Sequence, residues 1–170
     1  MRYKKVDAAY YYRALTPRWS HDPLSGEGAA ITGGRFNPEG YAALYVSSDP
    51  KAALYEAAQS QIIIPPKTVC TYQISINSVV DFSEGYNAKN WSREWSVWDM
   101  NWRKAWHVDK QRPATWKIAQ ELISDGVKGM LFPSLKAKGH TNLVIFLTNL
   151  EVADSISVID PQGDLQGMTA

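Results

Sequence analysis

The distribution of apolar and polar positions along the chain predicts several strands. Residues 68–76 alternate between polar and apolar side chains, which is the pattern of a strand with one face in the core. The more apolar set, expected to face the core, is Cys70, Tyr72, Ile74 and Ile76. Short continuous apolar runs indicate further, buried strands. These runs are 10–15, 41–47, 127–132 and 143–147, and 79–82 is expected to continue the sheet after a kink.

Two segments carry the signals of helices. Ser48-Asp49-Pro50 supplies a capping side chain and a proline at the first helical position, which predicts a helix over 51–60. After Pro113, apolar residues at helical spacing predict an amphipathic helix that Gly126 ends. These apolar residues are Trp116, Ile118, Ala119, Leu122 and Ile123.

The remaining pattern indicates a single domain. Segment 17–32 is rich in Pro, Gly and Ser and is expected to be a loop, and the chain beyond 159 is expected to be loosely held. Strands that do not alternate regularly with helices favour an α+β fold. We therefore expect one compact domain over 1–170, with antiparallel or mixed sheets flanked by helices. Its core is expected at about 10–150 and a loose tail at about 160–170.

A tryptophan-rich segment, 90–107, has a pattern of its own. Its tryptophans, at positions 91, 95, 98, 102 and 106, would fall within roughly 80° of one another on a helix of about 100° per residue. The rest of that helix would be polar. Two interpretations remain open: the tryptophans form part of the domain's own core, or they form a surface for a partner protein, because Trp is enriched among interface anchors.

Composition and charge exclude several classes of protein. With 45% hydrophobic and 21% charged residues the chain is in the globular range, and a scattered net charge of +1 lacks the basic footprint of a nucleic-acid binder. The cluster Lys136, Lys138 and His140 is read as a solvated loop. No segment is apolar enough to span a bilayer, and the single Cys70 fits a reducing compartment, so we expect a cytoplasmic protein. The isolated histidines predict no metal site.

The turn Gly33-Gly34-Arg35-Phe36-Asn37 is a candidate phosphate site. Paired glycines permit positive φ and close backbone approach, and they are expected to present bare amides beside an Arg guanidinium, which forks onto phosphate oxygens. The turn matches neither a Walker loop nor a dinucleotide fingerprint, and a Gly-Gly turn beside a surface Arg is common. Two interpretations therefore remain open: a site for a phosphate or pyrophosphate ligand, or an ordinary Gly-Gly turn beside a surface Arg.

Glu56 and Ser134 are candidate polar site residues. A carboxylate among the apolar residues of the predicted helix 51–60 needs a partner, because burying it unpaired is costly. The alternatives are an ion pair with Arg13 or Arg35, or a catalytic role. Ser134 ends an apolar run without the Gly-x-Ser-x-Gly elbow of serine hydrolases, so that class of enzyme is not favoured.

Taken in order, these strings resemble the RES domain family, which is named after an Arg, a Glu and a Ser that match Arg35, Glu56 and Ser134. The resemblance runs from about 10 to 147. Phe36 stands where the family usually has Trp, and the tryptophan-rich segment is longer than the family's, so nothing is carried over to it. The matching strings are Tyr12-Arg13, Gly26-Glu27-Gly28-Ala29, Gly34-Arg35-Phe36-Asn37, Leu44-Tyr45, Leu54-Tyr55-Glu56, Pro133-Ser134 and Asn142-Leu143-Val144.

The resemblance implies an ADP-ribosyltransferase-like fold and NAD as the substrate, with no permanently bound cofactor. Glu56, Arg35 and Tyr45 would then be catalytic: Glu56 would stabilise positive charge on the ribose, Arg35 would bind phosphates, and Tyr45 would stack on or bond the nicotinamide. Ser134 would bind the ligand or hold Glu56. Further NAD-binding candidates on the matching strings are Arg13, Asn37 and Asn142.

The resemblance also implies a toxin that arrests growth and a cognate antitoxin with an Xre-like DNA-binding region. The acceptor of the ADP-ribosyl group stays open: water or phosphate would deplete NAD, whereas a side chain of a cytosolic host protein would make the chain a mono-ADP-ribosyltransferase. A non-catalytic binding module that uses the stripe Trp91–Trp106 is the remaining alternative. No membrane and no direct nucleic-acid partner is expected.

Overall fold

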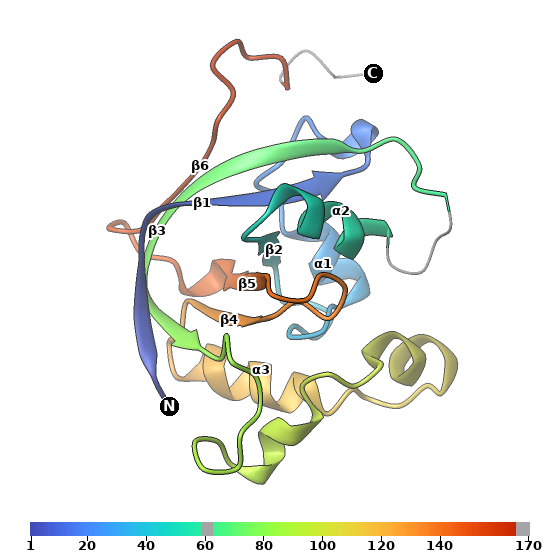
Figure 1. The fold of residues 1–170 in the computed structure, drawn as a ribbon, viewed down its shortest axis with the longest axis vertical. Coiled ribbons are helices and arrows are strands. Elements are labelled where there is room, and N and C mark those ends of the chain that lie inside the picture. Colours follow the sequence, from blue (N-terminus) through green and yellow to red (C-terminus); the bar gives the residue numbers. More distant parts are fainter. Residues whose placement is uncertain (59–62, 166–170) are drawn as a thin grey trace.

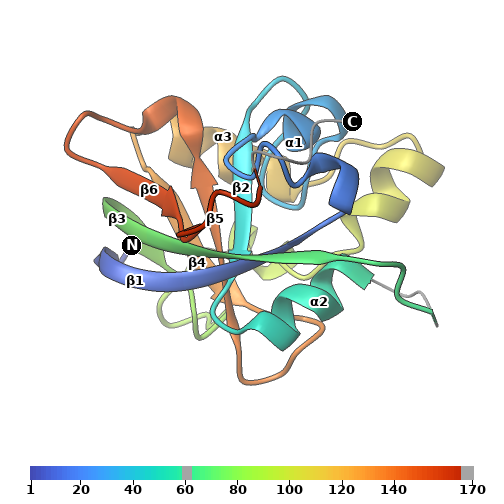
Figure 2. The ribbon, with the colours of Figure 1, turned by 90° about the horizontal axis from the view of Figure 1, so that it is seen from above.

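The computed structural model describes residues 1–58 and 63–165. Long strands β1 and β3 run side by side over most of their length (Figure 1, Figure 2). The strands are β1 (Tyr3–Leu15), β2 (Ala43–Ser47), β3 (Thr68–Asp81), β4 (Gly129–Pro133), β5 (Thr141–Phe146) and β6 (Ser155–Val158). The α-helices are α1 (Glu27–Thr32), α2 (Pro50–Ala58) and α3 (Thr115–Ser124). Shorter helical turns are η1 (Pro17–Trp19), η2 (Arg93–Val97), η3 (Lys104–Val108) and η4 (Leu147–Asn149).

The strands of the described chain form one mixed sheet that closes on itself. Its order is β1-β2-β5-β4-β3-β6, and β1 also pairs with β3, which closes a ring of five strands. Only the β3–β4 pair is parallel. The predicted α+β class with an antiparallel or mixed sheet is confirmed, and the sheet is a single closed one with helices packed outside it.

Strand periodicity explains why β2, β4 and β5 are continuously apolar. One set of alternate side chains enters a core inside the ring, which we call the ring core, and the other set packs against α3. Figure 1 shows α3 lying against β4. The ring core takes residues from all five strands of the ring, among them Val6, Leu44, Tyr72, Leu131 and Leu143. Because both faces of these strands are buried, alternation disappears from their sequence.

Local signals fixed α2, β3 and α3 as expected. The Asp49 carboxylate accepts hydrogen bonds from the amides of Lys51 and Ala52, so Asp49 caps α2. β3 runs without interruption to Asp81, with Cys70, Tyr72, Ile74 and Ile76 in the ring core as predicted. Gly126, just beyond α3, has a φ of +75°. Residues 59 and 60 of the predicted helix lie outside the described residues.

One expectation about the rest of the chain is wrong, and two further contacts were not predicted. The segment predicted as a loop contains α1, which ends at Gly33 with a φ of +69°. Strand β6, which pairs with β3, was not anticipated. Just before the predicted tail, the Ile159 amide donates to the carbonyl of Thr71, and within the tail Leu165 packs on the ring core. Residues 166–170 of that tail lie outside the described residues.

The tryptophan-rich segment is not one helix. It consists of η2, an irregular stretch, and η3, which is a single π-helical turn. The Trp102 amide donates to Met100 instead of to Trp98, and the Asn101 side chain accepts from the Lys104 amide, so a new turn begins there. The single stripe predicted for Trp91–Trp106 is therefore wrong, because the helix that would align it is broken.

Most of these tryptophans pack within the domain. Trp91, Trp95 and Trp98 surround Phe82, with ring centroids 4.7, 5.0 and 5.6 Å from it. Trp106 packs on Trp116 of α3 at 4.7 Å. The core interpretation therefore holds for these residues, and the structure does not present them as a common partner surface.

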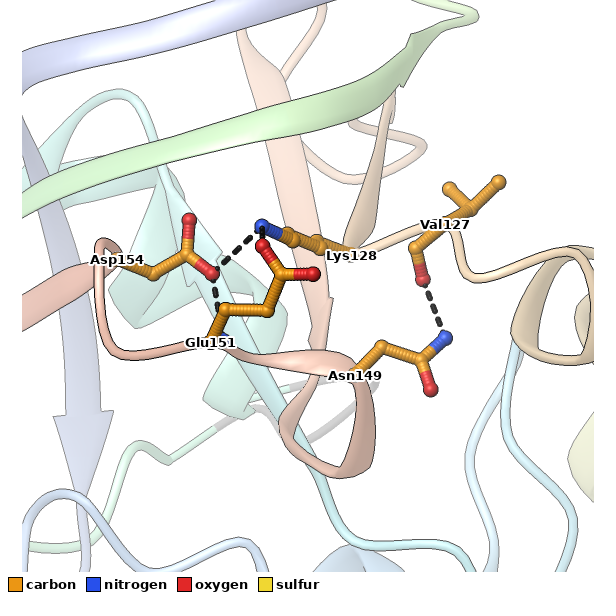
Figure 3. Close-up of polar contacts among 5 residues, drawn as sticks. All are labelled: Val127, Lys128, Asn149, Glu151 and Asp154. Atoms are coloured by element: carbon orange, nitrogen blue, oxygen red, sulfur yellow. Dashed lines mark hydrogen bonds and ion pairs between the residues drawn. The ribbon is translucent and has the colours of Figure 1, made fainter.

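A buried ion cluster fastens the C-terminal part of the chain to the ring. The Lys128 ammonium, which is 4% exposed, lies 2.8 Å from carboxylate oxygens of both Glu151 and Asp154 (Figure 3). Nearby, the Asn149 side chain donates to the carbonyls of Ile123 and Val127. Together these contacts fix the segment that leads into β6. Within the described chain, no helix has the length and apolar character needed to cross a membrane.

Candidate active site

A cavity of about 890 Å³ opens beside the ring. Its volume is in the range of small-molecule sites. Its wall comes from β1, α1, the turn after α1, β2, α2, β5 and the irregular stretch at 99–103. The predicted site residues that line it are Arg13, Arg35, Tyr45, Glu56 and Asn142. Residues from five separate parts of the chain thus meet in one place, whereas Ser134 and Asn37 are not part of the described wall.

The Glu56 carboxylate on α2 is held by two neutral donors. Its Oε1 accepts hydrogen bonds from Ser134 Oγ at 2.7 Å and from Asn142 Nδ2 at 2.8 Å. Asn142 is itself oriented, because its Oδ1 accepts from Ser47 Oγ at 2.7 Å. Within the described residues no donor contacts Oε2 of Glu56, and neither Arg13 nor Arg35 forms an ion pair with it. The carboxylate is thus fixed in direction, and one of its oxygens remains available to a ligand.

Ser134 lies behind the cavity wall and acts through Glu56. Besides donating to Glu56, its hydroxyl oxygen accepts from the amides of Ala137 at 2.9 Å and Lys136 at 3.3 Å. Those two bonds use its acceptor capacity and point its proton at the carboxylate. Of the two roles expected for Ser134, the geometry corresponds to holding Glu56.

Arg35 lines the cavity and also anchors its wall. One terminal nitrogen, Nη1, donates to the carbonyls of Trp98 at 2.9 Å and Met100 at 2.7 Å. Burial lowers the pKa of Arg35, and the negative charge of Glu56 opposes that shift. Arg35 stays charged because its reference pKa is so high. The guanidinium therefore has donors left for a ligand after fixing the stretch that carries Trp98 and Met100.

The glycines before Arg35 give it its position without offering free amides. The Gly33 amide donates to Ala29 and the Gly34 amide to Asn37, so both are used within the turn. A Cβ on Gly34 would lie 2.6 Å from the Tyr45 hydroxyl, which is closer than packed atoms tolerate. The expected close approach is confirmed, whereas the expected row of bare amides is wrong, because the turn consumes them.

The side chains of Tyr45 and Asn37 stabilise this turn through hydrogen bonds. The Tyr45 hydroxyl accepts from the Phe36 amide at 2.9 Å and donates to Asn37 Oδ1 at 2.8 Å. Asn37 is fully buried, and its Nδ2 donates to three backbone carbonyls, those of Ala29, Pro38 and Tyr41. Asn37 therefore orders the turn and lies apart from the cavity wall. Burial raises the pKa of Tyr45, so its hydroxyl stays protonated. Because that hydroxyl is bonded within the turn, Tyr45 contributes its ring to the cavity wall.

Arg13 of β1 fixes the opposite side of the cavity. Its Nη1 donates to the carbonyls of Pro23 at 3.2 Å and Ser25 at 3.1 Å. The Tyr72 hydroxyl donates to the same Pro23 carbonyl at 2.7 Å. Arg13 thus holds the segment that leads into α1, and it lines the cavity with the rest of its guanidinium.

Sequence reasoning missed part of the wall, namely Asp99, Asn101, Trp102 and Arg103. The helical interpretation had placed Arg103 on a polar, solvated face. A signal was present in the order Asp-Met-Asn within the tryptophan repeat, since Asp and Asn favour helix starts and turns over helix interiors.

Comparisons with known proteins agree with this arrangement. The sequence model of the RES domain family matches residues 10–166. This chain belongs to the RES domain family. A curated relative, "Toxin Res" of Yersinia enterocolitica, is 24% identical over 151 residues, which cover 88% of this RES domain chain and 91% of the relative.

The fold of this RES domain is similar to a solved structure, that of the M. tuberculosis MbcT–MbcA toxin–antitoxin complex. The TM-score is 0.57 at 18% identity, with 96% of this chain and 90% of that one covered. In the present RES domain, Ser134 and Glu56 are in direct contact and Arg35 lines the same cavity as Glu56.

Proposed function

We propose that this RES domain is the toxin of a toxin–antitoxin pair and that it cleaves NAD at the bond between nicotinamide and ribose. The observation that carries this proposal is the Glu56 carboxylate, oriented by Ser134 and Asn142 in a cavity that the Arg35 guanidinium also lines. A fixed anion and a fixed cation in one cavity suit a substrate that has a cationic ring at one end and phosphates beyond it.

The chemistry follows from where charge develops. Breaking the nicotinamide–ribose bond leaves positive charge on the ribose ring and releases neutral nicotinamide, as in glycoside cleavage. A carboxylate that is already oriented stabilises that charge without reorganising. Glu56 fills this role through Oε2, and Arg35 binds the pyrophosphate through the nitrogens that Trp98 and Met100 leave free. The Tyr45 ring forms an apolar wall for the nicotinamide.

The finer part of the proposal is the acceptor. Transfer to water or inorganic phosphate depletes NAD, and transfer to a cytosolic host protein modifies that protein. Labelled NAD added to cell extract separates the two, because the label either stays in small molecules or moves to protein. We place the reaction in the cytoplasm, where NAD is available.

The cavity mouth suits inhibition by a partner protein. Three large apolar side chains that line the cavity are exposed: Trp19 at 58%, Ile31 at 65% and Leu135 at 40%. Apolar side chains that are exposed where they line a cavity offer a partner protein apolar surface to bury. We propose that the antitoxin, with its Xre-like region, covers this mouth or inserts a segment into it, and the toxin–antitoxin complex named above supports a partner of that kind.

The decisive experiment measures free nicotinamide after the purified chain is mixed with NAD under three conditions: with no addition, with inorganic phosphate, and with cell extract. Release that the cognate antitoxin abolishes supports the proposal. Absence of release under all three conditions would contradict it and would leave a non-catalytic binding module as the better interpretation.

A further inference from the structure

Arg103 is the second guanidinium of the cavity, and the resemblance to known proteins assigns it no role. It follows the irregular stretch between η2 and η3 and lines the cavity together with Asp99, Met100, Asn101 and Trp102. In the described ranges no carboxylate forms an ion pair with Arg103. The charge of Glu56 acts on Arg103 without forming an ion pair with it, so among the described residues its guanidinium is left with N–H groups for a ligand.

The position of Arg103 is set by its neighbours. Its guanidinium carbon lies 4.5 Å from the centre of the Trp102 ring, and Trp102 is only 7% exposed, so the ring is a fixed platform. A guanidinium stacked on an aromatic face keeps its N–H groups pointing outward from its edge, in the fork that matches phosphate oxygens.

The stretch that carries Arg103 is tied to Arg35. Arg35 donates to the carbonyls of Trp98 and Met100, so it fixes the backbone just before Arg103, and both arginines line the same cavity. Burial lowers the pKa of Arg35, and the positive charge of Arg103 lowers it further, which places the two charges within electrostatic reach of each other. An anion bound between the two guanidinium groups would offset this repulsion.

We propose that Arg103 is a second phosphate-binding residue, which holds the pyrophosphate of the dinucleotide together with Arg35 and leaves Glu56 to act at the ribose. This inference rests on the proposed function, because it names how the same cavity holds its substrate. Arg103 lies in the turn that begins after the irregular residues 98–101, and it lines the cavity there.

Arg103 offers a cleaner test than Arg35. Replacing Arg35 removes a ligand contact and also releases the carbonyls of Trp98 and Met100, so binding and folding change together. Within the described residues Arg103 forms no hydrogen bond or ion pair that holds the wall, so its replacement removes its stacking on Trp102 and its charge near Glu56 and Tyr45. Arg93, an exposed arginine of η2 that does not line the cavity, is the matched control.

The experiment compares the wild type with Arg103→Ala, Arg103→Lys and Arg93→Ala. Loss of one charge-assisted phosphate contact is expected to raise KM for NAD about tenfold and to weaken ADP-ribose binding in calorimetry about tenfold, with kcat nearly unchanged. Arg103→Lys should recover part of the loss, and Arg93→Ala should match the wild type. Inhibition by free nicotinamide, which has no phosphate, should be the same in all four proteins.

The outcomes separate the two proposals. Equal ADP-ribose affinity and equal KM in wild type and Arg103→Ala would overturn the role of Arg103 while leaving NAD cleavage intact. A wild type that binds ADP-ribose through Arg103 but releases no nicotinamide would refute the reaction and support the phosphate site. Weaker nicotinamide inhibition in Arg103→Ala would mean that the variant distorts the whole cavity, which would overturn the assignment.

Discussion

Replacing Glu56 by Gln removes one negative charge from the cavity and keeps the size of the side chain. The Gln carbonyl oxygen takes the place of Oε1 and accepts the same bonds from Ser134 and Asn142. The amide nitrogen takes the place of Oε2. The substitution therefore tests the charge of Glu56 with little change in shape.

The expected loss can be worked out from electrostatics. A full charge about 4 Å from a carboxylate is stabilised by roughly 4 kcal/mol at an effective dielectric constant of 20. Glu56 is half-buried, and the ribose bears less than a full charge in the transition state, so only part of this energy is available. At about 1.4 kcal/mol per factor of ten, we expect kcat to fall about 100-fold. The Kd for NAD should change little, because the phosphates bind elsewhere.

The assay follows nicotinamide release over a range of NAD concentrations and measures the Kd for NAD separately by calorimetry. Glu84→Gln, the same chemical change at an exposed position away from the cavity, is the control. Ser134→Ala removes one of the two bonds that hold the carboxylate and should lower kcat about tenfold, less than Glu56→Gln. If Glu56→Gln kept its kcat, or lost affinity and turnover to the same extent, the electrostatic role of Glu56 would be wrong.

Three further outcomes follow from packing and charge elsewhere in the structure. Gly34→Ala should destabilise the fold by about 1–3 kcal/mol, measured by urea unfolding, because its Cβ would meet Tyr45, whereas Gly28→Ala, which meets nothing, should not. Lys128→Met should lower Tm by leaving the Asp154 carboxylate buried without its cation, and an unchanged Tm would refute the view that this ion pair fastens the C-terminal segment. Burial by itself would raise the pKa of Asp154, but hydrogen bonds from Lys128 and Glu151 hold it below its usual value. The stability from Asp154 is thus complete above pH about 4 and lost as pH falls through the lower folded-state pKa, so acid unfolding of the wild type should be steeper than that of Asp154→Asn.

Some of these features could be predicted because their causes are local. Asp49 and Pro50 start α2 through contacts within one turn, and the alternation over 68–76 follows from which face of β3 enters the ring core. The apolar runs at β2, β4 and β5 are continuous because both faces of these strands are buried. The order of the short sequence motifs indicated the correct family for the same reason, because each motif forms one turn, strand or helix through local interactions.

Other features depended on partners far away in the chain. Strand β6 has four residues and forms because β3 offers it an edge. The tryptophan-rich segment has helical spacing. Its carbonyls at Trp98 and Met100 nevertheless accept hydrogen bonds from Arg35, more than 60 residues away in sequence, in place of bonds within a continuous helix. The sequence of the segment alone does not predict that bonds to Arg35 replace bonds within a helix.

The sequence by itself determined the five strands of the ring, helices α2 and α3, and the residue types that the site would use. Only the tertiary structure decided their roles: Asn37 orders the turn, Ser134 holds Glu56 from behind the wall, and Arg103 reaches the cavity. The physical reason is that hydrogen-bond partners are chosen in space. Ser134 and Asn142 lie 78 and 86 residues from Glu56, and they meet it only because the ring of strands closes.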